Sequence, residues 1–359
     1  MTGPLGMPRP RSRWWIVRVS VSVALIAFLL SRLDVSNMAR FFSGADWLLV
    51  ALTLVMVVMD RGLMAGRWIV LLEGLGIAAS RARVVKIFFL STFFGSFLPT
   101  GIGGEAIRAA SFTRLSAKGV ESIASVVMDR IMGMLSMLLT GLAALIVFYR
   151  IYPHRALLAT VLALSVAAVA GLALLLSRSV HRRVLARLGQ AGESVEPAWR
   201  ASTRRAIGAM ERYRRQPGLL TLVLLMSVGV QVLRILQAYL LSQAMALGSP
   251  WVYFFCFVPL ILLITMLPIS VSGLGTTNLA YVALFGSVGM DPDGAFVLSV
   301  LILALGVIGN LPGGVIYALE GFTASAVPTI SNQQTREENS SPMANPQYRI
   351  RPNKLERHQ

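Results

Sequence analysis

Residues 97–108 read Phe97-Leu98-Pro99-Thr100-Gly101-Ile102-Gly103-Gly104-Glu105-Ala106-Ile107-Arg108. They follow an apolar run that begins at Ile87 and is too short to cross a bilayer, because a membrane-spanning helix needs about 20 apolar residues. Proline blocks continuation of a helix, and glycine permits a sharp turn. Irregular backbone at membrane depth survives only where protein or a water-filled cavity surrounds it. The stretch therefore predicts the tip of a broken or re-entrant helix that lines a polar site; a surface loop between two ordinary helices is the alternative.

The composition predicts a polytopic membrane protein. Of the 359 residues, 55% are hydrophobic and 14% are charged, and the mean hydropathy is +0.69. The formal net charge of +17 would suggest nucleic acid in a soluble chain, but here it indicates cytoplasmic loops and anionic lipid head groups, so we expect no nucleic-acid partner. The single cysteine and the three scattered histidines predict no disulfide, metal or other cofactor.

An all-α fold with six full membrane spans and two hairpins accounts for about eight apolar segments. The expected spans are residues 14–30, 47–72, 120–149, 157–176, 219–247 and 296–319. The expected hairpins are residues 87–115 and 251–288, each of which turns at a glycine motif and returns to its own side. We expect a basic loop after the second span, formed by Arg61, Arg67, Arg81, Arg83 and Lys86.

The transmembrane domain is predicted to cover residues 14–322, between a flexible basic segment at 1–13 and a disordered tail at 323–359. Residues 178–218 form the largest hydrophilic loop, with ten arginines and no lysine. Because no small-x-small cleavage site follows Leu30, the first span is interpreted as a retained anchor rather than as a signal peptide.

Basic residues predict the orientation. With both termini in the cytoplasm and both hairpins returning to their own side, 27 Lys and Arg residues lie in cytoplasmic segments and 4 lie outside. This asymmetry fits the positive-inside rule and indicates a bacterial inner-membrane protein with cytoplasmic termini.

The two glycine turns resemble each other. Leu98-Pro99 precedes Gly101-Ile102-Gly103, and Leu267-Pro268 precedes Gly273-Leu274-Gly275. The predicted hairpins open to opposite sides, and inverted repeats with broken helices are typical of secondary transporters.

Polar residues inside spans are functional candidates, because charges in a membrane are costly unless they are paired or hydrated. Asp129 and Arg130 point about 100° apart on a helix, so each needs a partner on another element. Gln231, Arg234 and Gln237 form a polar stripe on another span. A structural ion pair and an interhelical hydrogen-bond ladder are the alternatives.

The half-helices that begin after the glycine turns present free N–H groups and a positive dipole end, which suit an anion such as phosphate. Thr276 or Thr277 is expected to cap the second half-helix. Glu105 and Arg108 lie one turn apart on the first, where Glu105 could instead only satisfy end N–H groups. No Ser/His/Asp arrangement, HExxH motif or P-loop is found, so no catalytic residue is assigned.

Three motifs in order carry a resemblance to a known family: residues 97–108, residues 125–130 (Ser125-Val126-Val127-Met128-Asp129-Arg130) and residues 270–276 (Ser270-Val271-Ser272-Gly273-Leu274-Gly275-Thr276). Over roughly residues 15–322 the chain resembles the flippase-like membrane family that includes the transmembrane region of lysylphosphatidylglycerol synthases. The resemblance implies an integral inner-membrane protein that handles lipids across the bilayer. It also implies that the first glycine turn, Glu105, Arg108, Asp129 and Arg130 belong to a shared site.

Two features depart from that family. In the full synthases an aminoacyl-transferase domain follows this region, and the 37 residues after Phe322 are too few to form one, so lysyltransferase activity is not expected. Family members often carry Arg-Glu just after the second glycine turn, where this chain has Thr277-Asn278, and this argues against a charged role for the second hairpin.

The sequence thus predicts a translocase that moves a phospholipid or a lipid-linked head group between leaflets. A membrane-embedded enzyme and a non-catalytic subunit of lipid or envelope biosynthesis are the alternatives. Membrane lipids, above all anionic phospholipids, are the expected partners; lipid-biosynthesis enzymes and a second copy of the chain are left open. The residues assigned to the head-group site are Pro99, Gly101, Gly103, Gly104, Glu105, Arg108, Asp129, Arg130, Gln231, Arg234, Gly273, Gly275 and Thr276.

Overall fold

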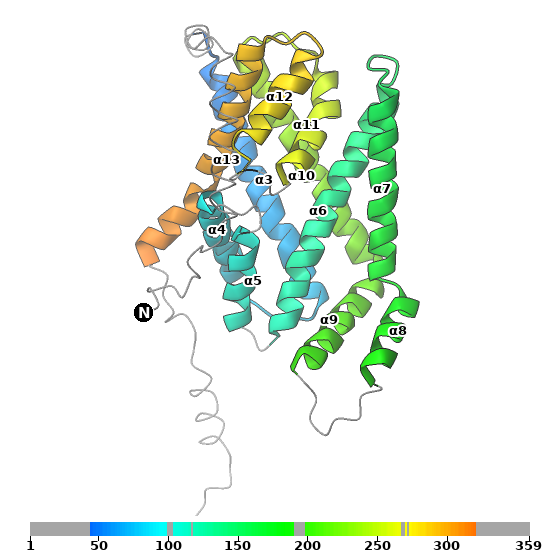
Figure 1. Ribbon diagram of the computed structural model, residues 1–359. Coiled ribbons are helices and arrows are strands. Elements are labelled where there is room, and N and C mark those ends of the chain that lie inside the picture. The colour runs from blue at the N-terminus through cyan, green and yellow to red at the C-terminus, as the bar shows by residue number, and fades with distance from the viewer. Residues whose placement is uncertain are drawn as a thin grey trace, which may run out of the picture. The chain divides into compact units, whose positions relative to one another are not determined.

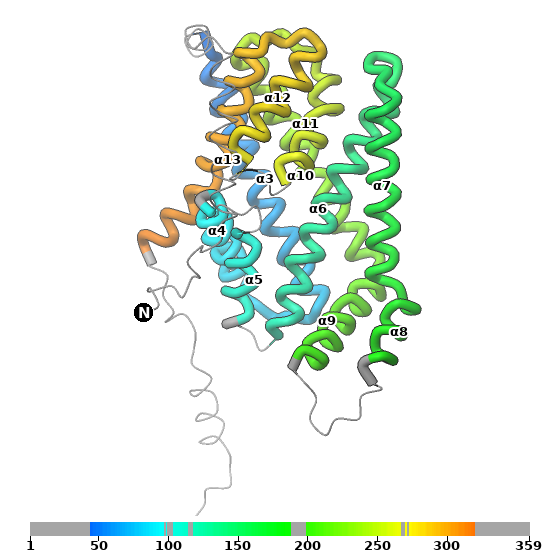
Figure 2. Tube along the Cα trace, in the orientation of Figure 1, coloured from blue at the N-terminus to red at the C-terminus, as the bar shows by residue number. Residues whose placement is uncertain are grey.

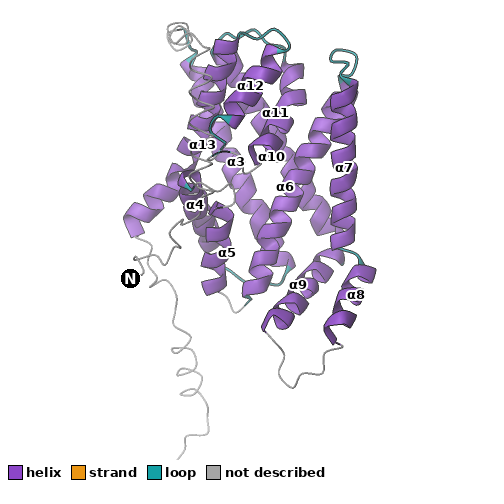
Figure 3. Cartoon of the chain, in the orientation of Figure 1, coloured by secondary structure: helices purple, strands orange, loops and turns teal. Residues whose placement is uncertain are grey.

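The computed structural model describes residues 44–98, 103–115, 118–189, 198–266, 270 and 273–320. These residues form helices joined by turns and short loops, without a strand among them (Figure 3). The eleven helices are α3 (Trp47–Gly74), α4 (Arg81–Phe97), α5 (Gly103–Leu115), α6 (Gly119–Val147), α7 (Arg155–Leu175), α8 (Arg178–Gly189), α9 (Ala198–Arg214), α10 (Pro217–Ala244), α11 (Trp251–Met266), α12 (Thr276–Gly286) and α13 (Pro292–Glu320). The all-α prediction is confirmed.

Five helices are long and apolar enough to cross a membrane: α3, α6, α7, α10 and α13. They match five of the six predicted spans in position. The sixth, at residues 14–30, lies outside the described residues, as do the N-terminal segment and the tail at 323–359. Helix α7 buries the smallest share of its apolar window, 11%, so most of its surface is available to lipid.

Two pairs of shorter helices form the hairpins. Helix α4 packs against α5, and α11 packs against α12. They have 17, 13, 16 and 11 residues, and each is too short to span a bilayer alone. Helix α5 contacts the N-terminal half of α6 through Arg108 and Asp129, whereas α11 contacts the C-terminal half through Pro259 and Gly141. The two hairpins therefore lie at opposite ends of the helix bundle (Figure 1).

The first hairpin depends on close backbone contact. A Cβ atom on Gly104 would lie 2.7 Å from the Ser91 carbonyl oxygen, and one on Gly95 would lie 2.8 Å from the Gly104 Cα. The outer face of α4 approaches α13 even more closely, because a Cβ on Gly313 would lie 2.0 Å from the Phe89 carbonyl oxygen. Gly313 follows Pro312, the one proline inside α13, and α13 changes direction toward its C-terminal end (Figure 2).

Each hairpin has its own apolar core. The core beside the first hairpin includes Trp68 and Phe112, whose rings meet edge to face with centroids 5.5 Å apart. The core beside the second includes Tyr281 and Phe285, which stack with centroids 5.5 Å apart. Aromatic packing thus stabilises both hairpins, so the two hairpins differ in their polar groups and not in this apolar support.

Two predictions about basic residues are wrong. Arg61 and Arg67 lie inside α3 rather than in a loop, because the helix continues without a break to Gly74. Arg81, Arg83 and Lys86 begin α4, so the loop itself is short. The hydrophilic stretch at 178–218 is also not a plain loop, since it forms the amphipathic helices α8 and α9 and the start of α10.

Candidate functional site

Within the described residues, eight Asp, Glu or Arg side chains lie away from the ends of the apolar bundle. They are Asp60, Arg61, Arg67, Glu105, Arg108, Asp129, Arg130 and Arg234. Five are arginines and three are carboxylates, so the set carries two more positive than negative charges. In a bundle of apolar helices such charges are costly unless each one has partners.

The first group is a triad in which two arginines share the carboxylate of Asp60. Asp60 is only 1% exposed. Arg61 Nη1 lies 2.5 Å from Asp60 Oδ2, and Arg234 Nε of α10 lies 3.3 Å from Oδ1. Arg61 Nε also donates to Asn310 Oδ1 of α13 at 2.8 Å, and Asn310 in turn donates to Ser96 of α4 at 2.7 Å. This triad therefore connects α3, α10, α13 and the end of α4.

The second group repeats the arrangement around Asp129. Arg67 Nε donates to Asp129 Oδ1 at 2.6 Å, and Arg108 Nη1 of α5 lies 3.3 Å from Oδ2. Arg67 also donates to Ser227 at 2.9 Å. The Arg108 guanidinium lies over Trp68 and Phe88, at 5.1 and 4.7 Å from the ring centroids. All three charged residues of this triad are buried.

One donor of the second triad is unused. Arg108 Nε is buried and makes no hydrogen bond to any described residue. A buried donor without an acceptor costs roughly 1–3 kcal/mol, and more for a charged group. The second triad therefore combines an excess positive charge with a free N–H group.

The third group is a simple pair, Glu105 with Arg130. Arg130 Nη1 lies 2.5 Å from Glu105 Oε2 in the first turn of α5. Their side chains are 23% and 30% exposed, for Arg130 and Glu105 respectively, against 5% to 9% in the second triad. The pair is thus the more accessible part of the charged set, next to the tip of the first hairpin.

Asp129 and Arg130 each have a partner on another helix, and they take different ones. Asp129 pairs with Arg67 of α3 and Arg108 of α5, whereas Arg130 pairs with Glu105 at the start of α5. The 100° step between neighbours favours separate partners without requiring them, since Asp60 and Arg61 are neighbours on α3 and pair with each other.

Sequence reasoning missed three members of the set: Asp60, Arg61 and Arg67. A usable signal exists, because Asp60, Met64 and Arg67 follow a spacing of four and then three residues and so share one face of α3. Seven residues of helix place Asp60 and Arg67 about 10 Å apart along the axis. The two triads therefore occupy different depths on one side of α3.

The polar residues Gln231 and Arg234 of α10 bind different neighbouring helices, α6 and α3 respectively. Gln231 donates to Ser136 of α6 at 3.2 Å and is buried, while its Oε1 atom has no donor within the described chain. Arg234 instead turns to Asp60 and also contacts Met64 Sδ at 3.1 Å. Gln237 joins neither triad, and its Nε2 atom makes no hydrogen bond to a described residue.

Neutral groups line the second hairpin. The backbone of Gly273 and Gly275 has positive φ, at 80° and 85°, which accounts for glycine at both positions. Thr276 Oγ1 lies 2.7 Å from Ser270 Oγ. The prediction that a threonine caps α12 is wrong: Gly275 is the N-cap residue, and its N–H donates to Asn278 Oδ1 at 3.0 Å.

Two further residues assigned from the sequence, Pro99 and Gly101, lie outside the described residues. Gly103 is buried at the start of α5. Gly104 contacts the α4 backbone, so in this structure it allows α4 and α5 to pack closely within the hairpin. Within the described part of the chain, no group of three or more His, Cys, Asp or Glu side chains could hold a metal ion.

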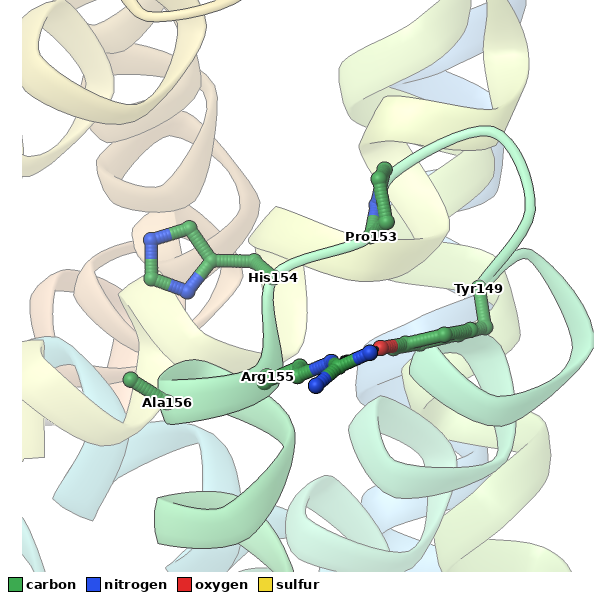
Figure 4. A pocket seen from close by; sticks show the side chains of 5 residues that line it. All are labelled: Tyr149, Pro153, His154, Arg155 and Ala156. Carbon is green, nitrogen blue, oxygen red and sulfur yellow. Dashed lines mark hydrogen bonds between the residues drawn. The ribbon is translucent and has the colours of Figure 1, made fainter.

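An open hollow at the loop between α6 and α7 is unrelated to the charged set (Figure 4). It is lined by Tyr149, Pro153, His154, Arg155 and Ala156. Arg155 Nε donates to the Tyr149 hydroxyl at 3.3 Å, and His154 Nδ1 accepts the Leu157 N–H at the start of α7. These groups close a turn, and nothing about them indicates a ligand.

Comparison with known proteins supports a lipid-related role. No curated protein matches the chain. A family model described as the lysylphosphatidylglycerol synthase TM region matches residues 15–313, which include all eight charged residues of the site. The chain therefore belongs to the lysylphosphatidylglycerol synthase transmembrane-region family, whose description makes it a membrane protein of lipid metabolism.

Proposed function

We propose that this protein translocates a phospholipid, or a lipid-linked head group that carries a phosphate, between the leaflets of a bacterial inner membrane. The observation that carries the proposal is the pair of Arg–Asp–Arg triads inside an apolar helix bundle. Each triad has two arginines for one aspartate. A phosphate would supply the missing negative charge.

The chemistry of arginine supports this choice of ligand. The guanidinium presents five donors in a planar fork that matches phosphate geometry. Arg108 still has a free N–H group in this structure, so it could bind a phosphate oxygen without breaking its contact with Asp129. The stacking on Trp68 and Phe88 holds the plane of that guanidinium in place.

The Glu105–Arg130 pair suits the first contact with a head group. It is the most exposed of the three charged groups, and it lies where α5 begins. A phosphate would attract Arg130, and the released Glu105 carboxylate could accept a cationic group of the same lipid. Lysylphosphatidylglycerol, the lipid in the family description, carries both kinds of charge.

The orientation follows from the basic residues. Arg61, Arg67 and Arg108 belong to the interior, which lowers the predicted cytoplasmic count from 27 to 24 against 4 outside. The asymmetry survives this correction, so we place the ends of α5, α7 and α9 on the cytoplasmic side. Labelling of single cysteines in intact cells, with Cys256 replaced, tests this placement. Label from outside that reaches a cysteine at Ser179 would overturn it.

Reconstitution tests the function directly. The full chain is placed in vesicles with a fluorescent phosphatidylglycerol, and the labelled lipid in the outer leaflet is bleached over time. We expect the wild type to exchange lipid between leaflets and Arg130→Gln to slow the initial rate about tenfold, because a charge-assisted hydrogen bond contributes roughly 1.5–3 kcal/mol.

Arg81→Gln is the matched control, because the chemical change is identical and Arg81 pairs with Glu73 at the protein surface with 77% of its side chain exposed. It should retain the wild-type rate. Wild-type protein that fails to accelerate exchange of any phospholipid would contradict a translocase and favour an enzyme or a partner subunit. Equal rates for Arg130→Gln and Arg81→Gln would remove Arg130 from the site.

A further inference from the structure

Helices α8 and α9 form a basic groove at the end of three spans. They pack against each other, and the polar side chains that line the groove between them are those of Arg178, His181, Arg182, Arg204, Glu211 and Arg215. The two helices follow the end of α7 and precede α10 (Figure 1). None of these residues belongs to the charged site inside the bundle.

The connections hold the groove at the membrane surface. Only two residues separate the end of α7 from Arg178, and two separate Arg214 from the start of α10. Tyr213 is fully buried and donates to the Leu71 carbonyl oxygen at 3.0 Å, while Arg212 donates to that of Leu75 at 2.9 Å. Helix α9 is thus tied to the end of α3, at the level where phospholipid head groups lie.

The charge of the groove is unbalanced. Four arginines line it, and Glu211 is its one carboxylate. That carboxylate is already engaged by Arg214 and Arg215, and the hydrogen bond from Arg214 lowers the pKa of Glu211 to about 2. The groove therefore keeps several positive charges without an equal number of negative ones.

Arg178 and Arg182 are the clearest excess charges. They are exposed, lie one helical turn apart and make no ion pair with any described residue. Like charges at this spacing destabilise a helix. An anion bound between them would remove that repulsion, and arginine forks suit phosphate oxygens.

We infer that the α8–α9 groove binds the phosphate of an anionic phospholipid in the adjacent leaflet. The site is separate from the translocation site, and the inference does not depend on the proposed function. A lipid is favoured over a soluble anion because the groove is fixed at the bilayer surface by spans on both sides, where anionic head groups are concentrated.

Binding to the full chain in detergent tests this inference. Short-chain phosphatidylglycerol is titrated by calorimetry into the wild type and into two double variants of α8 with the same change in charge. Arg178→Gln/Arg182→Gln removes two groove arginines, and Arg183→Gln/Arg187→Gln removes two exposed arginines that do not line the groove. We expect the groove variant to weaken binding about tenfold and the control to stay within about twofold.

Two other ligands and one further variant distinguish a bound phospholipid from a bound soluble anion and from a ligand at the translocation site. Short-chain phosphatidylcholine and inorganic phosphate should bind more weakly than phosphatidylglycerol to the wild type. The loss caused by the groove variant should persist in the Arg130→Gln background, because the two sites are distinct. If both double variants weakened phosphatidylglycerol binding equally, the binding would depend on overall positive charge and not on the groove, and the inference would be wrong. If inorganic phosphate bound as tightly as phosphatidylglycerol, the inference that the groove binds a lipid would be wrong.

Discussion

The two hairpins share a shape but not a chemistry. The first, α4–α5, is tied to its neighbours by ion pairs from Glu105 and Arg108. The second, α11–α12, is tied to α13 by a neutral hydrogen bond in which Asn278 donates to Ser299 at 2.6 Å, and its own two helices are joined by the hydroxyls of Thr277 and Thr265, which lie 2.9 Å apart. Among the described residues of α11 and α12 there is no charged side chain at all.

Under the proposed function, this difference makes the first hairpin the reactive half of the molecule and the second hairpin the passive half. A hydrogen bond between neutral groups holds no ion that an incoming charge could replace, whereas an ion pair can exchange one of its charges for another. Only the first hairpin offers groups that an ionic head group could compete for. The second hairpin is therefore expected to serve as the fixed counterpart against which the first one works.

The largest expected effect comes from Asp129→Asn, which leaves Arg67 and Arg108 buried around a neutral amide. Removing one partner of a buried ion pair typically costs about 3–5 kcal/mol. We expect a marked fall in the thermal unfolding temperature of the purified protein and less protein in the membrane.

Arg108→Gln is the internal control for that experiment. It leaves Asp129 paired with Arg67 alone, so charge in the triad is balanced and the loss of stability should be smaller than for Asp129→Asn. If Arg108→Gln proved as destabilising as Asp129→Asn, the description of the triad as carrying excess arginine would be wrong.

The hairpins themselves could be predicted because their signals are local. Proline followed by glycines marks both turns, and the flanking apolar runs are too short to span a bilayer. The pairing of residues in the triads could not be predicted, because the partners lie far apart in the sequence. Arg67 and Asp129 are 62 residues apart, and Arg234 and Asp60 are 174 residues apart. No local pattern in one sequence pairs such residues. For Arg61 and Arg67, charge favours a loop whereas helical periodicity favours α3, and the structure follows the periodicity.

Capping of the second hairpin shows the same limit. A threonine after a glycine is a reasonable cap in isolation, but both hydroxyls are used elsewhere in the fold, Thr276 with Ser270 and Thr277 with Thr265. Asn278 reaches back to the Gly275 N–H instead. The competing partners come from α11 and from the loop, so tertiary contacts decided which side chain caps.

A smaller effect is expected from Gly104→Ala, which tests whether the first hairpin is held by close packing as well as by charge. The added Cβ would lie 2.7 Å from the Ser91 carbonyl oxygen, which is backbone and cannot rotate away. Overpacking of this kind costs about 1–3 kcal/mol. We expect a lower unfolding temperature, measured on the detergent-solubilised protein.

Gly171→Ala on α7 is the matched control, because no atom lies within 4 Å of the position its Cβ would take. It should not lower the unfolding temperature. A Gly104→Ala protein as stable as the Gly171→Ala protein would show that α4 and α5 can separate without cost.

The smallest expected effect comes from Thr277→Val in the second hairpin. Thr277 is buried, and its hydroxyl lies 2.9 Å from that of Thr265, so the change removes one hydrogen bond and leaves the shape of the side chain nearly the same. Thr265 is not left unsatisfied, because its hydroxyl also donates to the Ile261 carbonyl oxygen at 2.8 Å.

The expected cost of Thr277→Val is therefore only that of a single hydrogen bond between membrane helices, about 0.6 kcal/mol. Lipid exchange in vesicles should proceed at the wild-type rate, because none of the eight charged side chains of the candidate site is altered. The measurement pairs the unfolding temperature with the initial exchange rate, beside Arg130→Gln. A variant that kept its stability but lost exchange would mean that the neutral hairpin takes part in translocation, and the division between a reactive half and a passive half would fail.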